Sequence, residues 1–580
     1  MRLPALVVAA PRTWSHPQIR VDFQAVLLVL LGAILVYLIL PPLVVLVQTS
    51  LYTTTFSGEF DRLTFDHYAR LLTRGALVTP LVNSVWFAVG SAGLALALGT
   101  VLAWIVERTN TPLRVLGHFS AFVSFAIPYV LYTIAWLLLL GKSGPINSLL
   151  IAIFGFPEAP LNAYSLWGMV LVEGFLWSPL VFLMMAAAFR SMDPSLEESA
   201  AVNGAGVWQT VRRVSLPLAL PSFLAVLLLV FIRAFESFEI PALIGLPGSV
   251  QVLTTRIYLG TTRFPPQHGE AAAFAVVLVL IVCGALYFYS RLTAQSHRFQ
   301  TITGKGFRPR LINLGPWRFL TLALLVAYFL LVLVLPVLMI AWVSFMPFNA
   351  PISVDALSLV TLKNYAKALA YPKITSAALN SVLLGIGSAS AVMLLAAVSS
   401  WLVLRGRVQG RWLLEQLGAM PLVFPGIVLG LAIMRLYLAI PVPVYNTLWI
   451  LAIAYVTRYI PYGMRYAHSG LLQIHRELED AAYISGATWW HGFRRVVLPL
   501  LSPAFWAGWI FVLLLSLKEL SMSVLLAGPP TPVISVAMFS LWNDGQVVEV
   551  AAFGVVWTIA VSIVAALFFA VGRRQGIQLQ

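Results

Sequence analysis

The first candidates for chemistry are ionisable residues that interrupt long apolar stretches of the chain. They are Arg233, Glu236, Glu239, Arg435, Arg458, Lys518 and Glu519. Glu236 and Glu239 are three positions apart and would share one face of a helix, as a path for a cation would require. Charged groups inside a hydrocarbon layer are costly and mark the routes of solutes or ions. Arg233, Glu236, Glu239, Lys518 and Glu519 are therefore a candidate translocation path. The alternative, that these side chains pair with one another or reach water at helix ends, stays open.

Other chemistry finds little support in the residues. The sequence has no nucleophile motif and no HExxH, and its eight histidines are dispersed without metal-ligand spacing. We therefore expect no catalytic residue, no fixed metal and no cofactor. The tripeptide GKS at 141–143 lacks the first glycine of a phosphate-binding loop, because position 136 is Trp, and TGKG at 303–306 fails as well. We therefore expect no nucleotide-binding site in this chain.

One polar segment occurs twice. EESAAVNGAGVWQTVRRVSLPL (197–218) and EDAAYISGATWWHGFRRVVLPL (479–500) are identical at 11 of 22 positions, at an offset of 479 − 197 = 282. Asp193 and Pro194 are typical of a helix start, and Gly204 and Gly486 of a helix end. The pattern predicts a short helix in each copy, at about 194–206 and 476–488. Acids in the first turn disfavour an anionic membrane surface. Together with the small side chains of the alanine pairs (200–201 and 481–482), they favour close docking of a protein partner.

The composition indicates what must position these residues. The chain is 60% hydrophobic and 10% charged, with a mean hydropathy of +0.91, whereas soluble proteins average about 25% charged residues. A helix crosses the hydrocarbon core in about 20 apolar residues, and continuous apolar blocks exclude a barrel. We predict an all-α integral membrane protein with twelve transmembrane helices. The expected spans are 24–48, 82–106, 117–140, 165–189, 219–238, 271–291, 318–344, 379–404, 412–436, 446–467, 502–524 and 550–571.

Charge sets the expected orientation. With the N-terminus inside, the inner segments hold 22 Lys and Arg residues and the outer segments hold 9. Because cytoplasmic loops collect these residues, both termini and both copies of the acidic segment are predicted to be cytoplasmic. The net charge of +15 is then explained by the cytoplasmic loops and does not indicate a nucleic-acid partner. The first span follows three arginines without a small-residue cleavage site, which favours a retained anchor.

The sequence divides into two similar halves. LVNSVWFAVGSA (81–92) matches ALNSVLLGIGSA (378–389) at an offset of 297, which also pairs Pro128 with Pro425. The difference of 15 from the other offset places extra residues within 141–164. Duplication of a six-span unit predicts two transmembrane domains of the same orientation, at 1–291 and 318–580. A basic cytoplasmic linker joins them at 292–317.

The repeated segment resembles the EAA motif of permease subunits of binding-protein-dependent ABC importers, in the type I importer family. The positions that carry the match are Glu198, Ala200, Gly204 and Pro217 in the first copy and Asp480, Ala482, Gly486 and Pro499 in the second. Ser199 and Asp480 depart from the usual residues, and Glu197 and Glu479 lie alongside, so which acid makes the main contact stays open. The resemblance implies that each short helix is a coupling helix.

The resemblance also implies the partners. Two copies of an ABC ATP-binding subunit would dock at the cytoplasmic side, and a solute-binding protein would deliver cargo at the outer side. The chain would then be a multi-pass protein of the bacterial cytoplasmic (inner) membrane and a permease rather than an enzyme.

The cargo is a separate question. Total length and the segments FESFEIPALIG (235–245) and LKELSMSVLLAG (517–528) look most like ferric-iron transport permeases. Permeases for thiamine, a phosphorylated sugar or another small solute remain alternatives. An ATP-independent secondary transporter also has six plus six spans, but it leaves the paired acidic helices without a purpose. A membrane enzyme would need a nucleophile or metal motif.

Overall fold

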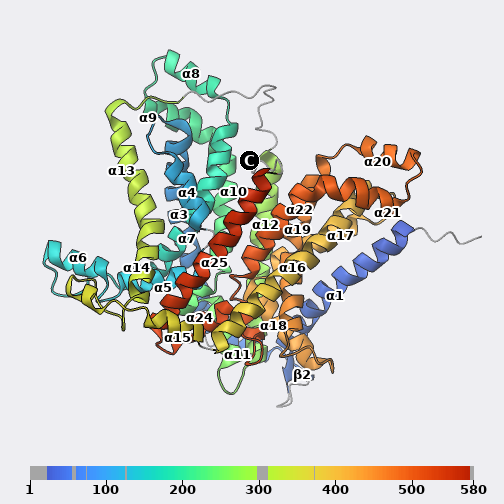
Figure 1. Cartoon of the computed structure of the whole chain (residues 1–580). Helices are drawn as coiled ribbons and strands as arrows, with labels where there is room; N and C mark the ends of the chain where they lie inside the picture. Colours follow the sequence, from blue (N-terminus) through green and yellow to red (C-terminus); the bar gives the residue numbers. More distant parts are fainter. Residues whose placement is uncertain are drawn as a thin grey trace, which may run out of the picture.

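The computed structural model describes residues 23–54, 60–73, 75–124, 127–296, 311–370 and 372–574. The expected N-terminal charges Arg2, Arg12 and Arg20 lie outside these residues, as does 297–310 of the expected linker. The described part is almost entirely helical, with one small antiparallel hairpin (Figure 1).

The helices of the first half precede the linker. They and the hairpin strands are α1 (Phe23–Leu51), β1 (Tyr52–Thr54), β2 (Phe60–Leu63), α2 (Asp66–Thr73), α3 (Val78–Arg108), α4 (Val115–Ser124), α5 (Tyr129–Leu140), α6 (Pro145–Phe154), α7 (Leu166–Ser191), α8 (Pro194–Val202), α9 (Val207–Thr210), α10 (Leu216–Phe235), α11 (Leu253–Thr262) and α12 (His268–Ser296). Two π-helical turns interrupt them, at Val211–Ser215 and Pro241–Gly245.

The second half repeats the order of the long helices. Its helices are α13 (Arg318–Phe329), α14 (Leu335–Ser344), α15 (Lys363–Ala370), α16 (Pro372–Arg405), α17 (Trp412–Ala419), α18 (Gly426–Ala439), α19 (Leu448–Leu472), α20 (Arg476–Ile484), α21 (Trp489–Gly492), α22 (Leu498–Ser516), α23 (Ser523–Leu526), α24 (Ile534–Asn543) and α25 (Val547–Arg574). Its π-helical turns are Leu330–Val334, which joins α13 to α14, and Phe493–Val497.

Within the described residues, ten helices are long and apolar enough to cross a membrane, and α17 with α18 makes an eleventh if the bent pair is one span. The remaining predicted span, 446–467, is helix α19, whose arginines Arg458 and Arg465 lower its apolarity. The multi-pass all-α architecture is therefore confirmed. Two predicted spans are divided into two helices near their middle.

These two interrupted spans break at equivalent prolines. The predicted span 117–140 is divided into α4 and α5, and 412–436 into α17 and α18 with a bend of 106°. Pro128 and Pro425 lie just before the second helix of each pair, with extended backbone at ψ 138° and 145°. Proline has no N–H to donate and crowds the preceding turn, so a helix does not run through it easily. The two breaks therefore lie at equivalent positions of the halves, since 425 − 128 = 297.

The extra residues of the first half form a helix of their own. α6 follows α5 after a four-residue turn and has no counterpart between α18 and α19, where only residues 440–447 connect the two. Asn147 ties α6 down by donating to the carbonyl oxygens of Leu140 and Leu161 at 3.0 and 2.9 Å. The insertion predicted within 141–164 is confirmed.

The first helix of each half packs against the other half. Tyr37 of α1 is hydrogen-bonded to Tyr437 of α18 at 3.0 Å. Tyr328 of α13 is hydrogen-bonded to Ser178 of α7 at 3.0 Å. In Figure 1, α1 accordingly lies beside the later helices and α13 beside α4. These two exchanged helices therefore connect the halves.

Close helix packing holds each half together through small residues. A Cβ on Gly99 of α3 would lie 2.6 Å from Cβ of Val181 on α7, and one on Gly463 of α19 would lie 2.6 Å from Cγ1 of Val392 on α16. Small residues allow such backbone approach between membrane helices. Gly463 is at the position equivalent to Val181, because 181 + 282 = 463, so the second half has a glycine where the first half has a valine.

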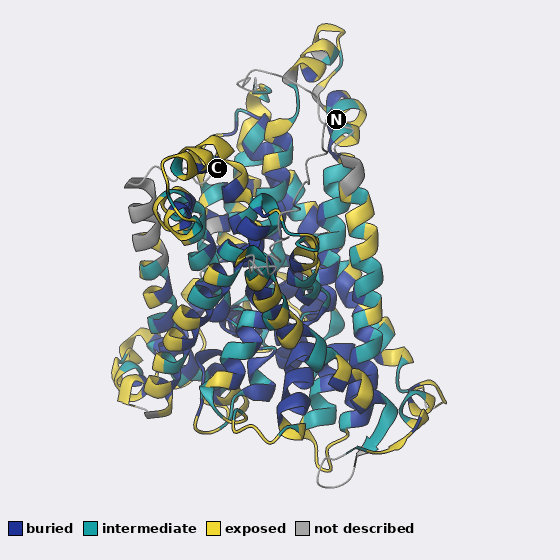
Figure 2. Cartoon of the chain, turned by 90° about the vertical axis from the view of Figure 1, so that its right-hand side faces the viewer, coloured by how far each residue is buried: buried dark blue, intermediate teal, exposed yellow. Residues whose placement is uncertain are grey.

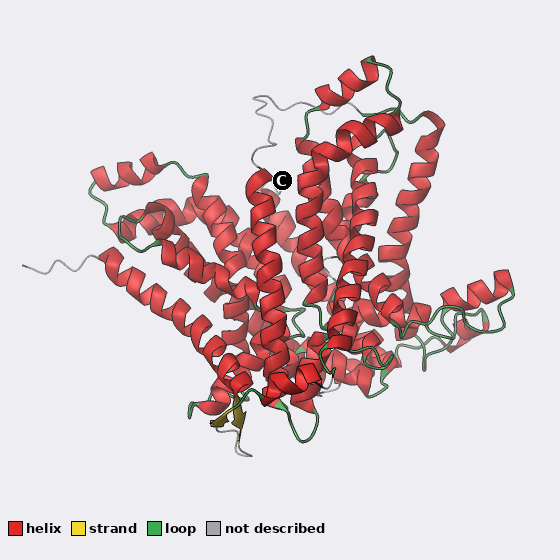
Figure 3. Ribbon diagram, turned by 180° about the vertical axis from the view of Figure 1, so that it is seen from behind, coloured by secondary structure: helices red, strands yellow, loops and turns green. Residues whose placement is uncertain are grey.

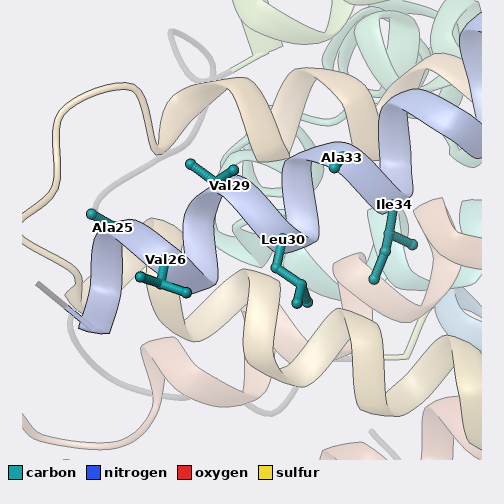
Figure 4. A pocket seen from close by; sticks show the side chains of 6 residues that line it. All are labelled: Ala25, Val26, Val29, Leu30, Ala33 and Ile34. Carbon is teal, nitrogen blue, oxygen red and sulfur yellow. The ribbon is translucent and has the colours of Figure 1, made fainter. Parts of the chain in front are cut away.

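Burial follows the helix interfaces. Figure 2 shows buried residues along the inner sides of the bundle and exposed residues on its periphery and ends. Figure 4 shows an open hollow on α1, lined by Ala25, Val26, Val29, Leu30, Ala33 and Ile34. Because none of these side chains is polar, the hollow suits lipid chains and offers no group to hold a polar solute.

Candidate coupling helices and inter-half network

The acidic helices α8 and α20 lie at the same end of the molecule, opposite the β1–β2 hairpin, and the two helical groups diverge toward that end (Figures 1 and 3). α8 begins at Pro194, and Asp193 caps it by accepting a hydrogen bond from the Ser195 N–H at 2.9 Å. That backbone hydrogen bond lowers the pKa of Asp193 below its usual value. The predicted helix start is confirmed, while the helices are shorter than expected and end at Val202 and Ile484.

A glycine with a left-handed backbone follows the end of each helix. Gly204 has φ of +80° and Gly486 has φ of +84°. The next N–H folds back in each copy, from Ala205 to the Ala200 carbonyl and from Ala487 to the Ala482 carbonyl, both at 3.0 Å. This is the Schellman arrangement that glycine favours, because a Cβ is strained at positive φ.

The first acid of each pair faces inward and is anchored. Glu197 is paired with Arg108 of α3 at 3.6 Å and accepts a hydrogen bond from Ser215 at 2.7 Å. Glu479 is paired with Arg405 of α16 at 3.2 Å and accepts one from the Trp401 ring N–H at 3.0 Å. Both carboxylates are buried. The two ion pairs occupy equivalent positions of the halves, because 405 − 108 = 297 and 479 − 197 = 282 are the two offsets of the sequence repeat.

The second acid of each pair faces outward. Glu198 and Asp480 are exposed, Ala200 and Ala482 are half-buried, and Pro217 and Pro499 are exposed at the start of the next span. The sequence left open which acid is available to a partner; the geometry separates an anchoring acid from an exposed one. Arg108 and Arg405 were missed as anchors, although the 297 offset pairs them.

A second cluster joins the two halves near the ends of α10 and α22. Glu236 lies between Arg233 of its own half, at 2.7 Å, and Arg458 of the other half, at 3.3 Å. Arg233 also donates to the hydroxyl of Tyr462, across the same boundary. Glu236 is 7% exposed, so this is a buried ion-pair network. The pairing of Glu236 with Arg233 agrees with the alternative that the sequence left open.

Neighbouring carboxylates extend the network. Glu239 accepts a hydrogen bond from Ser521 at 3.1 Å, and Glu519 accepts from the hydroxyl of Tyr459 at 2.8 Å and the N–H of Met522 at 3.0 Å. Glu173 of α7 accepts from Trp177 at 2.8 Å and from Ser237 at 3.0 Å. It was missed, though it is the only acid of its predicted span.

Two expectations about this cluster need correction. α10 ends at Phe235 and α22 at Ser516, so the two glutamates and Lys518 with Glu519 follow the helices instead of lying within them. Glu236 lies in the turn that follows α10, and residues 237–238, which have no regular structure, separate it from Glu239, so the two do not share a helix face. Beyond these helix ends, Glu236 contacts Arg458 and Glu519 contacts Tyr459, both of α19.

The structure gathers the predicted path residues but leaves one candidate elsewhere. Lys518 is buried, with its Nζ 4.9 Å from the centre of the Tyr129 ring, as in a cation–π contact. Arg435 lies over the ring of Phe60 in the hairpin, at 5.7 Å, and belongs to a different region. Among the residues described, no three His, Cys, Asp or Glu side chains are arranged to hold a metal ion.

Comparison with known proteins identifies similar chains. The family described as binding-protein-dependent transport system inner membrane component matches twice, at residues 95–292 and 409–575. The ferric transport system permease protein FbpB of Actinobacillus pleuropneumoniae is 24% identical over 520 residues, covering 88% of this chain and 74% of the relative. The probable ABC transporter permease protein y4fN of Sinorhizobium fredii is 28% identical over 511 residues, covering 83% and 84%.

A relative of half this length is also similar. The putative 2-aminoethylphosphonate transport system permease protein PhnU of Salmonella choleraesuis is 28% identical over 239 residues, covering 41% of this chain and 82% of its own. The similar proteins therefore name more than one cargo.

Proposed function

Because the chain belongs to the family of binding-protein-dependent transport system inner membrane components, matched in two tandem regions, we propose that it couples ATP hydrolysis on separate subunits to solute import through α8 and α20. The observation that carries this proposal is the duplicated anchor. One buried Glu–Arg pair in each half fixes a short acidic helix to a membrane-spanning helix at the same end of the molecule.

Each short helix acts as a lever on which an ABC ATP-binding subunit docks. The exposed acids Glu198 and Asp480 and the half-buried alanines 200 and 482 form the docking face. The anchors Glu197 and Glu479, the glycine ends Gly204 and Gly486 and the prolines Pro217 and Pro499 hold that face rigidly. A rigid lever lets closure of two ATP-binding subunits move the helices α3 and α16.

The two transmembrane domains are 1–291 and 318–580, joined by the linker 292–317. Both termini and both levers are cytoplasmic, in agreement with the excess of Lys and Arg in the segments at that side. The protein resides in the bacterial inner membrane, and the solute-binding protein delivers cargo to its outer face. The exchanged helices α1 and α13 keep the halves attached while they rock.

The network around Glu236 lies on the translocation path. Arg233, Glu236, Glu239, Lys518 and Glu519 come from both halves and are buried or half-buried where the halves meet. Rocking that opens a path between the halves must break the Glu236–Arg458 ion pair and the Ser521–Glu239 hydrogen bond. The network therefore closes the path at rest.

Ferric iron is the proposed cargo. The names of two relatives that match both halves of the chain support it: the ferric transport permease of Actinobacillus pleuropneumoniae and a putative one of Haemophilus influenzae. The phosphonate-transport name of the half-length relative in Salmonella choleraesuis supports a small organic solute instead. Uptake of radiolabelled iron by cells with and without the chain separates the two. Iron uptake unchanged by loss of the chain rejects the ferric assignment.

The coupling role is tested by purification and transport. A cassette ATPase should co-purify with the full chain, and replacement of Glu198 by Gln together with Asp480 by Asn should remove it. Transport by the chain alone in liposomes without ATP would instead establish a secondary transporter.

A further inference from the structure

The same group of one tryptophan and two arginines follows each acidic helix in the sequence. An exposed tryptophan is followed four and five positions later by two exposed arginines, and the positions are equivalent because 490 − 208 = 282. The residues are Trp208, Arg212 and Arg213 in the first half and Trp490, Arg494 and Arg495 in the second. The tryptophans are 75% and 54% exposed. Positions four apart lie on one side of a helix, so each tryptophan lies on the side of its first arginine.

Both groups share an unusual backbone. The arginines lie in π-helical turns, Val211–Ser215 and Phe493–Val497, closed by hydrogen bonds from Leu216 N–H to the Val211 carbonyl and from Leu498 N–H to the Phe493 carbonyl. π-helical turns are rare and are frequent at functional sites. The same local geometry has thus been kept in both halves although Val207 and Trp489, at equivalent positions, differ.

The second group frames a small hollow. It measures about 220 Å³ and is lined by Trp490, His491, Arg494 and Arg495. Stacked rings support it, since Phe493 lies 5.4 Å from the Trp489 ring and 6.3 Å from the Trp490 ring, centre to centre. His491 Nδ1 is hydrogen-bonded to Thr488 Oγ1 at 2.8 Å. The hollow therefore has two permanent cations, one imidazole and a rigid aromatic side.

These cations are not neutralised by carboxylates of the described chain. The arginine ion pairs found there belong to Arg108, Arg190, Arg233, Arg256, Arg405 and Arg458. None involves the four arginines of the two groups. An anion from outside the chain is the partner that such a site suits.

We propose that the hollow beside Trp490 binds the phosphate of an anionic phospholipid of the inner leaflet, and that the group around Trp208 is a weaker copy of the same site. Both groups begin membrane-crossing helices, 208–235 and 489–516, where tryptophan and arginine gather at the headgroup level and attract anionic lipid. The levers beside them carry exposed acids, so the face toward the ATP-binding subunits has the opposite charge. This inference rests on the proposed cytoplasmic orientation.

The test measures lipid bound to the purified full chain, without ATPase or binding protein, by native mass spectrometry. Phosphatidylglycerol and phosphatidylcholine are titrated in parallel. We expect wild type to prefer phosphatidylglycerol. Because each arginine near a membrane surface is worth about fivefold in affinity, the R494Q/R495Q variant should bind it roughly 30-fold more weakly. The variant R62Q/R70Q, with exposed arginines near the hairpin, is the matched control and should bind as wild type does.

Further variants make the outcome decisive. R494K/R495K keeps the charge and should keep most of the preference, which separates loss of the site from loss of the fold. R212Q/R213Q should have the smaller effect. Equal binding by R494Q/R495Q and wild type overturns the proposal, as does displacement of the lipid by millimolar inorganic phosphate, which assigns the site to a free anion. Normal lipid binding with loss of the co-purifying ATPase also overturns it and assigns the arginines to that subunit. A failure here leaves the coupling role untouched.

Discussion

Ser521 Oγ donates a hydrogen bond of 3.1 Å to Glu239 Oε1, and these residues occupy equivalent positions of the two halves, because 521 − 239 = 282. Where equivalent positions of two related units touch each other, the contact lies on the twofold axis that relates them. The bond therefore marks the pseudo-twofold axis of this chain. The residues differ in chemistry, a carboxylate facing a hydroxyl, so the halves are no longer interchangeable at the axis.

The Glu236–Arg458 pair near this axis should show energetic coupling. We expect Glu236→Gln and Arg458→Gln each to destabilise the protein. The double variant should lose less than the sum of the two, with an interaction energy of about 1–3 kcal/mol, because each single variant leaves a buried charge with fewer partners. Unfolding of all four proteins in the same detergent measures the cycle. An interaction energy near zero means that the pair does not hold the halves together.

Replacing an anchoring acid should weaken the fold as well as coupling. Glu197→Gln leaves the buried Arg108 without its carboxylate, and Glu479→Gln does the same to the half-buried Arg405. Loss of one partner costs about 3–5 kcal/mol in a buried pair. Thermal unfolding of the purified chain measures this. The matched controls Glu198→Gln and Asp480→Asn change exposed acids and should stay within about 0.5 kcal/mol of wild type. Equal losses for anchors and controls contradict the division of roles.

Substitution of the glycines at the ends of the levers should impair the protein because of their backbone conformation alone. A Cβ on Gly204 or Gly486 would meet nothing within 4 Å, but L-residues at such positive φ cost about 1–2 kcal/mol. We expect Gly204→Ala and Gly486→Ala to reduce ATPase co-purification and solute uptake, most strongly together.

The neighbouring Gly206 supplies the control for this prediction. It also has open space around its Cβ position but no positive φ, so Gly206→Ala should leave both measurements unchanged. Normal uptake by the double Gly204 and Gly486 variant refutes the lever mechanism.

The two glycine contacts between core helices should differ in whether they can be rescued. At Gly463 the nearest atom is the side-chain tip of Val392, so Gly463→Ala should lower the melting temperature and Val392→Ala should restore part of it. At Gly99 the added carbon would lie 2.8 Å from the backbone nitrogen of Phe182, and Val181→Ala should not rescue Gly99→Ala. Rescue at both sites, or at neither, contradicts this packing.

The sequence by itself determined the all-α membrane architecture, the duplication, the inserted segment and the glycines that stop the acidic helices. These features follow from local properties: apolar length, the missing N–H of proline, the backbone freedom of glycine and self-similarity at two offsets. They need no knowledge of which helices are neighbours.

Tertiary structure alone decided the pairings. Glu197 and Glu198 are adjacent and chemically alike, and only packing against Arg108 makes one an anchor and leaves the other exposed. The meeting of Glu236 with Arg458, 222 positions apart, and the exchange of α1 and α13 between the halves likewise depend on distant contacts. A buried charge is stabilised by whichever opposite charge the fold brings to it, and that choice is made in space.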